Sequence, residues 1–516
     1  MTPARPAGDT KAGGADLDRS ARAGVDVAET HAAIVFFVGD RAYKLKKPVN
    51  LGFLDFSTPD KRMRACRREV ELNRRFSPDV YLGVRDIVDS SGIPCDHLVV
   101  MRRMPADRRL ATLVRERRPV DDAVRSLAKL IAGAHAAAPR RADIAAEGTR
   151  DALRARWSAS FDQVRAFHGR VLDTGETIEI ERLTERFLSG RKALFDERVA
   201  AGRVVDGHGD LLADDIFCLD DGPRVLDCLD FDDRLRWLDG LDDAMFLAMD
   251  LERLGAPRLA ERFTDWYAEY AGDPAPPSLR HHYVAYRAFV RAKVACLRWS
   301  QGADAAAAEA GMFARIALRH LRAGAVTLAV VGGLPGTGKS TVAAALADRL
   351  GATLLASDRI RKELAGLAPE APAGAAYGAG IYTAEWTRRC YEALLRRAEM
   401  LLARGETVIV DASFTAARDR EAVAALGRRL AADVINLRCA TPADQAARRL
   451  RTRPRDVSDA DPAIAARMAE SAEPWPEAVT IDTSGAVERA VARAAAVVRP
   501  HGIEDVWSRR PRLAPD

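Results

Sequence analysis

Three of the seven aspartates in the stretch HGDLLADDIFCLDDGPRVLDCLDF, which covers residues 208–231, are candidates for catalysis and metal binding. Asp210 is a candidate general base, because a carboxylate can orient an attacking hydroxyl and accept its proton. Asp215 and Asp227 offer hard oxygen ligands of the kind that Mg²⁺ binds, with water completing its shell. The segment IFCLDDGPRVLD predicts a hairpin with a turn-rich tip, which would return Asp227 to a position beside Asp210. The stretch therefore predicts a site that binds a metal ion and activates a hydroxyl.

A second candidate site begins at Gly333, where GLPGTGKS matches the pattern G-x-x-x-x-G-K-[ST]. It follows the apolar run VTLAVVG and precedes a helical pattern, which is the context that a phosphate-binding loop requires. Its glycines let backbone N–H groups point at phosphate oxygens, and the positive helix end favours the anion. Lys339 is expected on the β and γ phosphates and Ser340 on Mg²⁺. The residues expected to hold the nucleotide are Gly333, Leu334, Pro335, Gly336, Thr337, Gly338, Lys339, Ser340 and Thr341.

Polar residues after the next apolar runs could act on the substrate of this loop. Asp358 follows the run TLLAS, a strand that we expect beside the phosphate-loop strand, and its carboxylate could accept a hydroxyl proton. Arg361, one helical turn later, could bind phosphate. The alternative is an Asp that caps a helix and an Arg on the surface of that helix. Asp411 ends TVIVDAS, where it would either support Mg²⁺ through water or only close the strand end.

The first site needs a basic residue for the phosphates, and the strand RAYKLKKPV supplies candidates. This run and AAIVFFVGD predict two antiparallel strands joined by the turn VGDRA. Lys44 is the expected phosphate lysine, and Lys46, on the same strand face, is the alternative. Glu69, in a helix expected around 59–76, would pair with the lysine, with Glu71 as the substitute.

A further strand, expected at 97–103, would present backbone groups near Met101 and Arg103 to adenine. Residues 25–105 are thus expected to form a small β-rich lobe. Residues 106–320 read as a helical lobe, in which Leu183, Phe187 and Leu194 are spaced to share one helical face.

The pattern changes after residue 325 to apolar strands alternating with amphipathic helices, which predicts a parallel sheet covered on both faces over 325–500. A leader at 1–24 is expected to be disordered, and 501–516 form a tail. The predicted fold class is an α+β two-lobed kinase-like domain followed by an α/β P-loop domain with a parallel sheet.

The motifs of both halves resemble known kinases. GLPGTGKST, SDRIRKEL, VIVDASF, RRLRTR and VSDAD resemble P-loop kinases of the polynucleotide-kinase and zeta-toxin type, in which RRLRTR would be an arginine-bearing lid. The motifs ETHAAIVFFVGDRAYKLKKPV, LGFLDFS, REVELNRR, HGDLLADDI, LDCLDF and YRAFVRAKV resemble a bacterial fusion family with an aminoglycoside phosphotransferase-like domain before the P-loop domain. The kinase-like loop pattern would be H-G-D-L-H-x-x-N, from which Leu212 and Asp215 depart. Asp215 keeps an oxygen ligand and adds a negative charge.

Composition excludes several classes of protein. The 516 residues are 48% hydrophobic and 30% charged, as in ordinary globular proteins, and no apolar run approaches the roughly 18–20 residues of a membrane span. The net charge of +5 is nearly neutral for this length and does not favour a nucleic-acid partner. Seven scattered cysteines predict free thiols in the cytoplasm. The sequence predicts no particular oligomeric state.

We therefore expect a phosphotransferase that uses ATP and Mg²⁺ at two nucleotide sites, each transferring the γ-phosphoryl group to a hydroxyl of a small-molecule substrate. Two alternatives stay open. Only the P-loop half would be catalytic, on a small molecule or a polynucleotide, with the N-terminal half an ATP-sensing pseudokinase. Otherwise the chain would be a non-enzymatic switch that responds to ATP.

Overall fold

The computed structural model describes residues 26–29, 32–50, 54–368, 371, 378–452 and 461–500. Its contacts divide the chain into two compact units, each formed by two stretches of sequence. Unit 1 comprises Met1–Ile144 and Val204–Asp273, and unit 2 comprises Ala145–Arg203 and Pro274–Asp516. The expected leader at 1–24 and tail at 501–516 lie outside the described residues. The domain limits expected at 105, 320 and 325 stay predictions.

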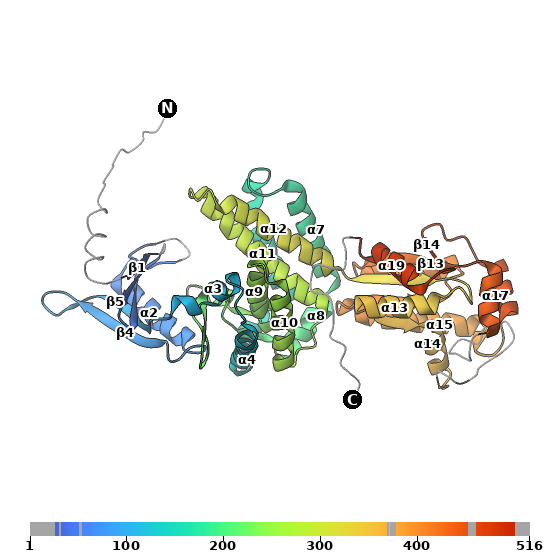
Figure 1. Ribbon diagram of the computed structural model, residues 1–516, viewed down its shortest axis with the longest axis horizontal. Helices are drawn as coiled ribbons and strands as arrows, with labels where there is room; N and C mark the ends of the chain where they lie inside the picture. The colour runs from blue at the N-terminus through green and yellow to red at the C-terminus, as the bar shows by residue number, and fades with distance from the viewer. Residues whose placement is uncertain are drawn as a thin grey trace, which may run out of the picture. The chain divides into compact units, whose positions relative to one another are not determined.

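An antiparallel five-stranded sheet forms the N-terminal part of unit 1 (Figure 1). Its strand order is β1–β2–β3–β5–β4. The strands are β1 Asp26–Glu29, β2 Ala33–Val38, β3 Arg41–Lys46, β4 Tyr81–Val88 and β5 Pro94–Arg102. The predicted hairpin is confirmed, since β2 pairs with β3 around Gly39, whose φ of 58° suits a glycine in a tight turn. Strand β4 was not predicted from the sequence, because YLGVRDIV does not alternate strictly between apolar and polar residues.

Helix α2, Pro59–Asn73, packs on this sheet and confirms the expected helix. Thr58 caps it by accepting a hydrogen bond from the Lys61 N–H, and proline occupies the first helical position. Alternation along β3 puts Ala42, Lys44 and Lys46 on one strand face. Ala42 packs there in a core cluster with buried residues of α2, so this face carries both lysines toward the helix.

Unit 1 continues with helices and two short strand pairs. The helices are α3 Leu110–Arg115, α4 Asp121–Ala137, α9 Gly240–Arg253 and α10 Pro257–Ala271. The strand pairs are β6 Val204–Asp206 with β9 Trp237–Asp239, and β7 Ile216–Leu219 with β8 Gly222–Val225. The second pair is the hairpin expected after Asp215. Residues 240–251 of α9 are all buried, including three aspartates.

Unit 2 combines a group of helices with a parallel sheet. The helices before the sheet are α6 Arg150–Val164, α7 Thr174–Gly190, α8 Lys192–Ala200, α11 Pro277–Ser300 and α12 Ala306–Ala323. The interpretation of Leu183, Phe187 and Leu194 as one helical face is wrong. Leu194 belongs to α8, because the chain leaves the helical conformation at Arg191, with φ −121° and ψ 25°.

The parallel sheet has the strand order β11–β12–β10–β13–β14, and it confirms the predicted parallel sheet and the three strands expected at VTLAVVG, TLLAS and TVIVDAS. They are β10 Thr327–Gly332, β11 Thr353–Ala356, β12 Val408–Asp411, β13 Asp433–Ala440 and β14 Val479–Asp482. Helices α13, Lys339–Leu350, and α19, Val487–Val498, pack together on the sheet, as do α15, Ala384–Ala403, and α16, Ala417–Arg429. Every residue of the central strand β10 is buried, as expected for a strand covered on both faces.

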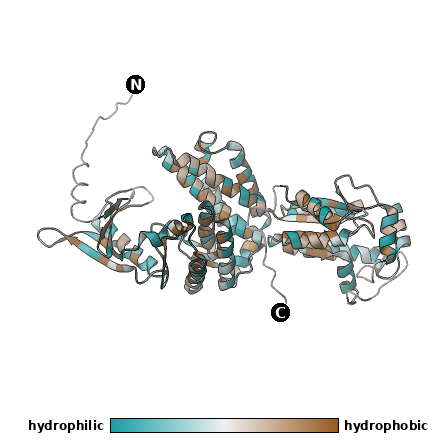
Figure 2. Cartoon of the chain, viewed as in Figure 1, coloured by the Kyte–Doolittle hydropathy of each residue, from teal (hydrophilic) through white to brown (hydrophobic). Residues whose placement is uncertain are grey.

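Most helices carry both hydrophilic and hydrophobic residues (Figure 2), as expected where one helical face is buried. Among the described residues, no helix combines the length and the apolar composition that a membrane crossing requires.

Candidate active sites

In unit 1 the structure brings together Lys44, Glu69 and Asp227 from three separate elements. Lys44 Nζ on β3 lies 2.9 Å from Glu69 Oε1 on α2 and 2.8 Å from Asp227 Oδ1, which follows β8. The Glu69 side chain is 1% exposed, whereas that of Asp227 is 58% exposed. The predicted lysine–glutamate pair is therefore present, and it also reaches the predicted metal ligand.

Lys46, the alternative lysine, contacts the same glutamate. Its Nζ lies 2.8 Å from Glu69 Oε2 and 2.9 Å from Asp230 Oδ2. Burial opposes the charge of Glu69, but the two lysines outweigh that effect and hold its pKa at about 2. Glu71, the substitute, pairs with Arg68 at the surface.

The carboxylate of Asp243, on α9, holds the loop that carries Asp210 through backbone hydrogen bonds. Asp243 Oδ2 accepts a hydrogen bond from the His208 N–H at 2.7 Å, and Oδ1 accepts one from the Gly209 N–H at 2.8 Å. His135 Nε2 lies 3.0 Å from Oδ2. A Cβ on Gly207 would lie 2.4 Å from the same carboxylate, so this backbone approach requires glycine. Burial works against the charge of Asp243, yet His135 and these N–H groups keep its pKa well below the usual range.

Asp210, Asp215 and Asp227 form the acidic part of the site. The pKa of Asp215 is well above its usual value, first because the carboxylate is buried and then because Asp227 and Asp210 lie near it. Lys44 and Arg109 oppose this shift. The hairpin thus returns Asp227 as expected, with a φ of 63° and its N–H donated to the Tyr81 hydroxyl at 3.1 Å.

Carboxylates crowded in this way suit a cation, and Asp215 and Asp227 would contribute two oxygen ligands to Mg²⁺ that a nucleotide brings with it. No group of three or more His, Cys, Asp or Glu side chains in the described ranges is arranged as a self-sufficient metal site.

The two residues expected near adenine differ in their surroundings. Met101 on β5 is 8% exposed and packs in the core of the sheet. The Arg103 N–H donates to the Asp40 carbonyl at 2.8 Å, and the Arg103 side chain pairs with Asp26. The N–H of Arg103 is therefore already used by the protein, and its role toward adenine stays a prediction.

In unit 2 the phosphate loop joins β10 to α13, as the motif predicts. Gly333, Gly336 and Gly338 have φ values of 143°, 80° and 80°, which side chains disfavour. A Cβ on Gly336 would also come within 2.7 Å of the Ala446 carbonyl oxygen. Thr483 Oγ1 donates to the Thr337 carbonyl at 2.6 Å and fastens the loop to the segment after β14. The loop is thus a preformed backbone cradle of the type that binds phosphate.

Lys339, Ser340, Asp411 and Asp358 lie around this loop. Asp411 is 5% exposed, and its Oδ1 has no hydrogen-bond partner. Burial raises the pKa of Asp411, whereas Lys339 and a hydrogen bond with Ser340 lower it, and Asp358 raises it further. A buried oxygen without a partner beside the loop lysine and serine fits an incoming metal-bound water. Both interpretations of Asp411, support of Mg²⁺ through water and closure of the strand end, stay predictions.

Two expectations for Asp358 are wrong. Its strand β11 does not adjoin β10, since β12 pairs with both strands and lies between them. Asp358 is also not a helix cap, because it lies within the first turn of α14, Ser357–Leu364, whose cap is Ala356. The carboxylate still lies near Asp411 at the carboxyl ends of the strands, where ligands of open α/β sheets bind.

Two arginines near this site, Arg361 and Arg449, make different contacts. Arg361 is 6% exposed and donates to the Ile381 carbonyl at 2.8 Å, while its guanidinium lies 5.0 Å from the centre of the Tyr382 ring. Arg449, in the predicted lid, donates to the Thr483 carbonyl at 2.7 Å. Its Nη1 would lie 3.5 Å from a Cβ added to Gly338. Arg449 therefore lies beside the phosphate loop, and its role in a lid stays a prediction. Arg453 lies outside the described residues.

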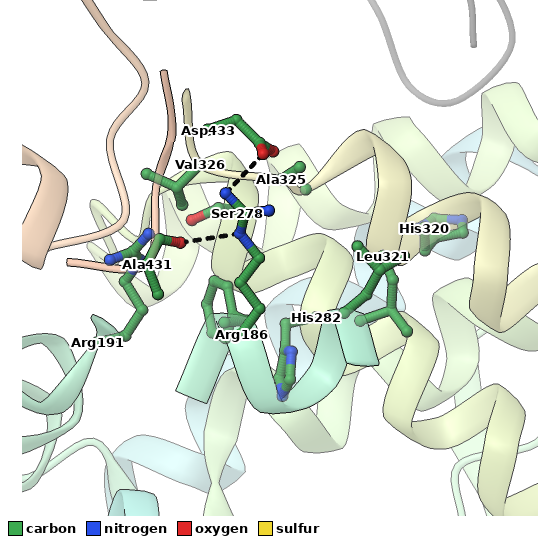
Figure 3. A pocket seen from close by; sticks show the side chains of 13 residues that line it. Arg186, Arg191, Ser278, His282, His320, Leu321, Ala325, Val326, Ala431 and Asp433 are labelled. Carbon is green, nitrogen blue, oxygen red and sulfur yellow. Dashed lines mark hydrogen bonds and ion pairs between the residues drawn. The ribbon is translucent and has the colours of Figure 1, made fainter. Parts of the chain in front are cut away.

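A second feature lies at the end of the parallel sheet where β10 and β13 begin. A cavity of about 20 Å³, room for about one water molecule, lies near the first residues of β10 and β13 (Figure 3). Arg186 crosses it, with Nη2 2.6 Å from Asp433 Oδ1 and Nε donating to the Ala431 carbonyl. Arg191, fully buried, donates to the Leu430 carbonyl at 2.8 Å. Here the helices α7 and α8 are fastened to the sheet domain.

Sequence reasoning overlooked Asp243, Asp230 and Thr483. Asp243 had a signal, because a charged residue inside the apolar helical run GLDDAMFLAMD needs a buried partner. Asp230 and Thr483 had no such signal in the sequence, because aspartate and threonine are common in the exposed segments that follow strands.

Comparisons with known proteins give three findings. A family model described as an AAA domain matches residues 328–475. The uncharacterized protein Rv2004c of Mycobacterium tuberculosis is 43% identical over 474 residues, which are 91% of this chain and 94% of that protein.

Two solved structures are similar to separate parts of the chain. The GDP complex of wild-type aminoglycoside 2'-phosphotransferase-IIIa is 15% identical, with a TM-score of 0.36, over 57% of this chain and 92% of that one. A gluconokinase from Sinorhizobium meliloti 1021 is 19% identical, with a TM-score of 0.26, over 34% of this chain and 93% of that one.

Proposed function

Because this chain belongs to the same family as Rv2004c of Mycobacterium tuberculosis, with a kinase-like N-terminal part before a P-loop kinase-like domain, we propose that it has two ATP-dependent phosphotransferase sites. Each site would transfer the γ-phosphoryl group of ATP to a hydroxyl of a small-molecule acceptor. The kinase-like folds support phosphotransfer as the class of reaction. The geometry of the two sites supports the proposal that each of them transfers a phosphoryl group to a hydroxyl.

The observation that carries the proposal is the buried Oδ1 of Asp411, which has no hydrogen-bond partner beside Lys339 and Ser340. An unpaired carboxylate oxygen costs free energy in the folded chain, and a metal-bound water would satisfy it. Gly333, Gly336 and Gly338 leave the cradle free of side chains that would block phosphate oxygens. ATP with Mg²⁺ would supply the transferable phosphoryl group and neutralise its charge when bound.

At the first site the ion pairs of Lys44 support the same chemistry. Glu69 holds the lysine in place, so that its ammonium can stabilise phosphate charge. Asp210, on the loop that Asp243 fixes, would orient the acceptor hydroxyl and take its proton. At the second site Asp358 would act as the base, and Arg449 would stabilise negative charge beside the loop.

Other features of the proposal concern the acceptor and the compartment. The near-neutral charge of the chain argues against a polynucleotide as acceptor, because nucleic-acid binding depends on many basic contacts. All seven cysteines are free thiols, which agrees with the reducing cytoplasm where ATP is abundant.

The test is a mass-spectrometric screen of a cell-metabolite extract with ATP and Mg²⁺, using the full-length protein. We expect two products that each gain one phosphate. Asp210→Asn should lower the formation of one product by about 100-fold, and Asp358→Asn should lower the other by a similar factor, since a general base contributes about 10²–10⁴-fold.

Asp214→Asn and Asp348→Asn are the matched controls, because these aspartates lie on the same loop and on the exposed side of α13. One product, lost only in Asp358→Asn, would leave the first site as an ATP-sensing pseudokinase. Tight ATP binding with no product from any extract would contradict phosphotransfer and favour the switch.

A further inference from the structure

The two lysines of β3 share one glutamate but have different surroundings. The Lys44 side chain is 19% exposed, and its ammonium reaches Asp227, the predicted metal ligand. The Lys46 side chain is 4% exposed. Its ammonium is enclosed by Glu69, by Asp230 and by the ring of Phe56, whose centre lies 4.7 Å away. Lys46 therefore presents no open side to a nucleotide, whereas Lys44 faces the acidic part of the site.

Each contact of Lys46 fixes a residue that matters to the first site. Its bond to Glu69 Oε2 complements the bond of Lys44 to Oε1, so the carboxylate cannot turn without breaking one ion pair. Its bond to Asp230 anchors the chain three residues after Asp227.

Asp227 needs such an anchor. Its φ of 63° is a left-handed conformation that residues other than glycine seldom adopt, and surrounding contacts must maintain it. The Tyr81 hydroxyl holds its N–H on one side, and Asp230 is held by Lys46 on the other.

We propose that Lys46 is a positioning residue of the first site, which holds Glu69 and the segment 227–230 so that Lys44 and Asp227 can act together on the phosphates and the metal. This inference rests on the proposed function of that site. It assigns the phosphate contact to Lys44 and makes the second lysine of YKLKK a fixed internal support.

The experiment uses the full-length chain carrying Lys339→Ala, which confines nucleotide binding to the first site. The probes are ATP, with and without Mg²⁺, and hydrogen exchange of the nucleotide-free chain. In this background Lys46→Met should change ATP affinity without Mg²⁺ by less than about threefold, while the Mg²⁺ concentration for half-maximal binding should rise at least about tenfold. Without nucleotide, exchange in 60–73 and 226–230 should become about tenfold faster.

Lys44→Met should instead weaken ATP binding both with and without Mg²⁺. Lys47→Met is the matched control, because Lys47 pairs with Glu29 outside this cluster, and it should change neither quantity. If Lys46→Met weakens ATP binding equally with and without Mg²⁺, Lys46 is the phosphate lysine and the inference is wrong. If Lys46→Met lowers only the melting temperature, Lys46 has a purely structural role and the inference is also wrong.

The two proposals fail in different ways. A Lys339→Ala chain that binds no ATP would overturn the proposed function of the first site. The hydrogen-exchange comparison of Lys46→Met with Lys47→Met would still decide whether Lys46 holds α2 and the segment after β8.

Discussion

Asp243→Asn should destabilise unit 1 by about 3–5 kcal/mol and lower phosphoryl transfer at the first site by at least about 100-fold. The carboxylate is fully buried and accepts hydrogen bonds from two backbone N–H groups of the Asp210 loop. An amide in its place would turn an NH₂ group toward at least one of these donors. The loop would then shift, and a misplacement of about 1 Å is enough for such a loss of rate.

The measurements for this variant are urea unfolding and steady-state turnover. Because the pKa of Asp243 is lowered in the folded chain, the ionised carboxylate stabilises the fold above its unfolded pKa. This contribution disappears as the pH falls through the folded value, so the variant and the wild type should converge in stability only in strong acid. Asp242 is the neighbouring buried aspartate, and a similar rate loss in Asp242→Asn would argue against a specific role for Asp243.

Asp411→Asn should have opposite effects on stability and on activity. Removing a charge from a buried carboxylate with an unpaired oxygen should stabilise unit 2 by about 1 kcal/mol. Loss of the same charge should lower turnover at the P-loop site by roughly 100-fold, because groups that support a bound metal ion through water contribute up to that factor. Thermal unfolding without nucleotide and turnover with ATP and Mg²⁺ measure the two effects.

Asp419 offers a comparison for this variant, since its pKa is also raised by burial but it lies on α16. Asp419→Asn should change turnover little. An Asp411→Asn protein that is both less stable and fully active would show that the carboxylate serves packing alone.

Local pattern was enough to predict the strands and the loop that carry the P-loop site. Alternating apolar strands and helices have few other ways to bury their surface, so the parallel sheet could be predicted from the sequence. The order of its strands could not. The sheet places β12 between β11 and β10, and this insertion moves Asp358 one strand further from the loop than expected. Crossover connections allow several strand orders, and the choice depends on packing over the whole domain.

The first site shows the same limit at the level of side chains. The spacing of Lys44 and Lys46 predicted that both lie on one strand face, and they do. It could not predict that one glutamate would bind both, since this depends on the distance between α2 and β3. Asp243 lies far along the chain from the loop it holds, and only its unusual place in an apolar helix pointed to a buried role.

Hydrogen bonds join the helices of unit 2 to the segments that lead into strands β12 and β13, and they determine how unit 2 unfolds. Arg191 donates to the carbonyl of Leu430, and the Ser278 hydroxyl donates to that of Gly405 at 2.7 Å. Both carbonyls belong to the sheet domain, and both donors come from the helices before it. Separating the two parts would leave these backbone groups without partners and expose a buried guanidinium. Helices and sheet domain should therefore lose their structure in one cooperative transition, so the connection near residue 325 is no simple linker but part of one folding unit.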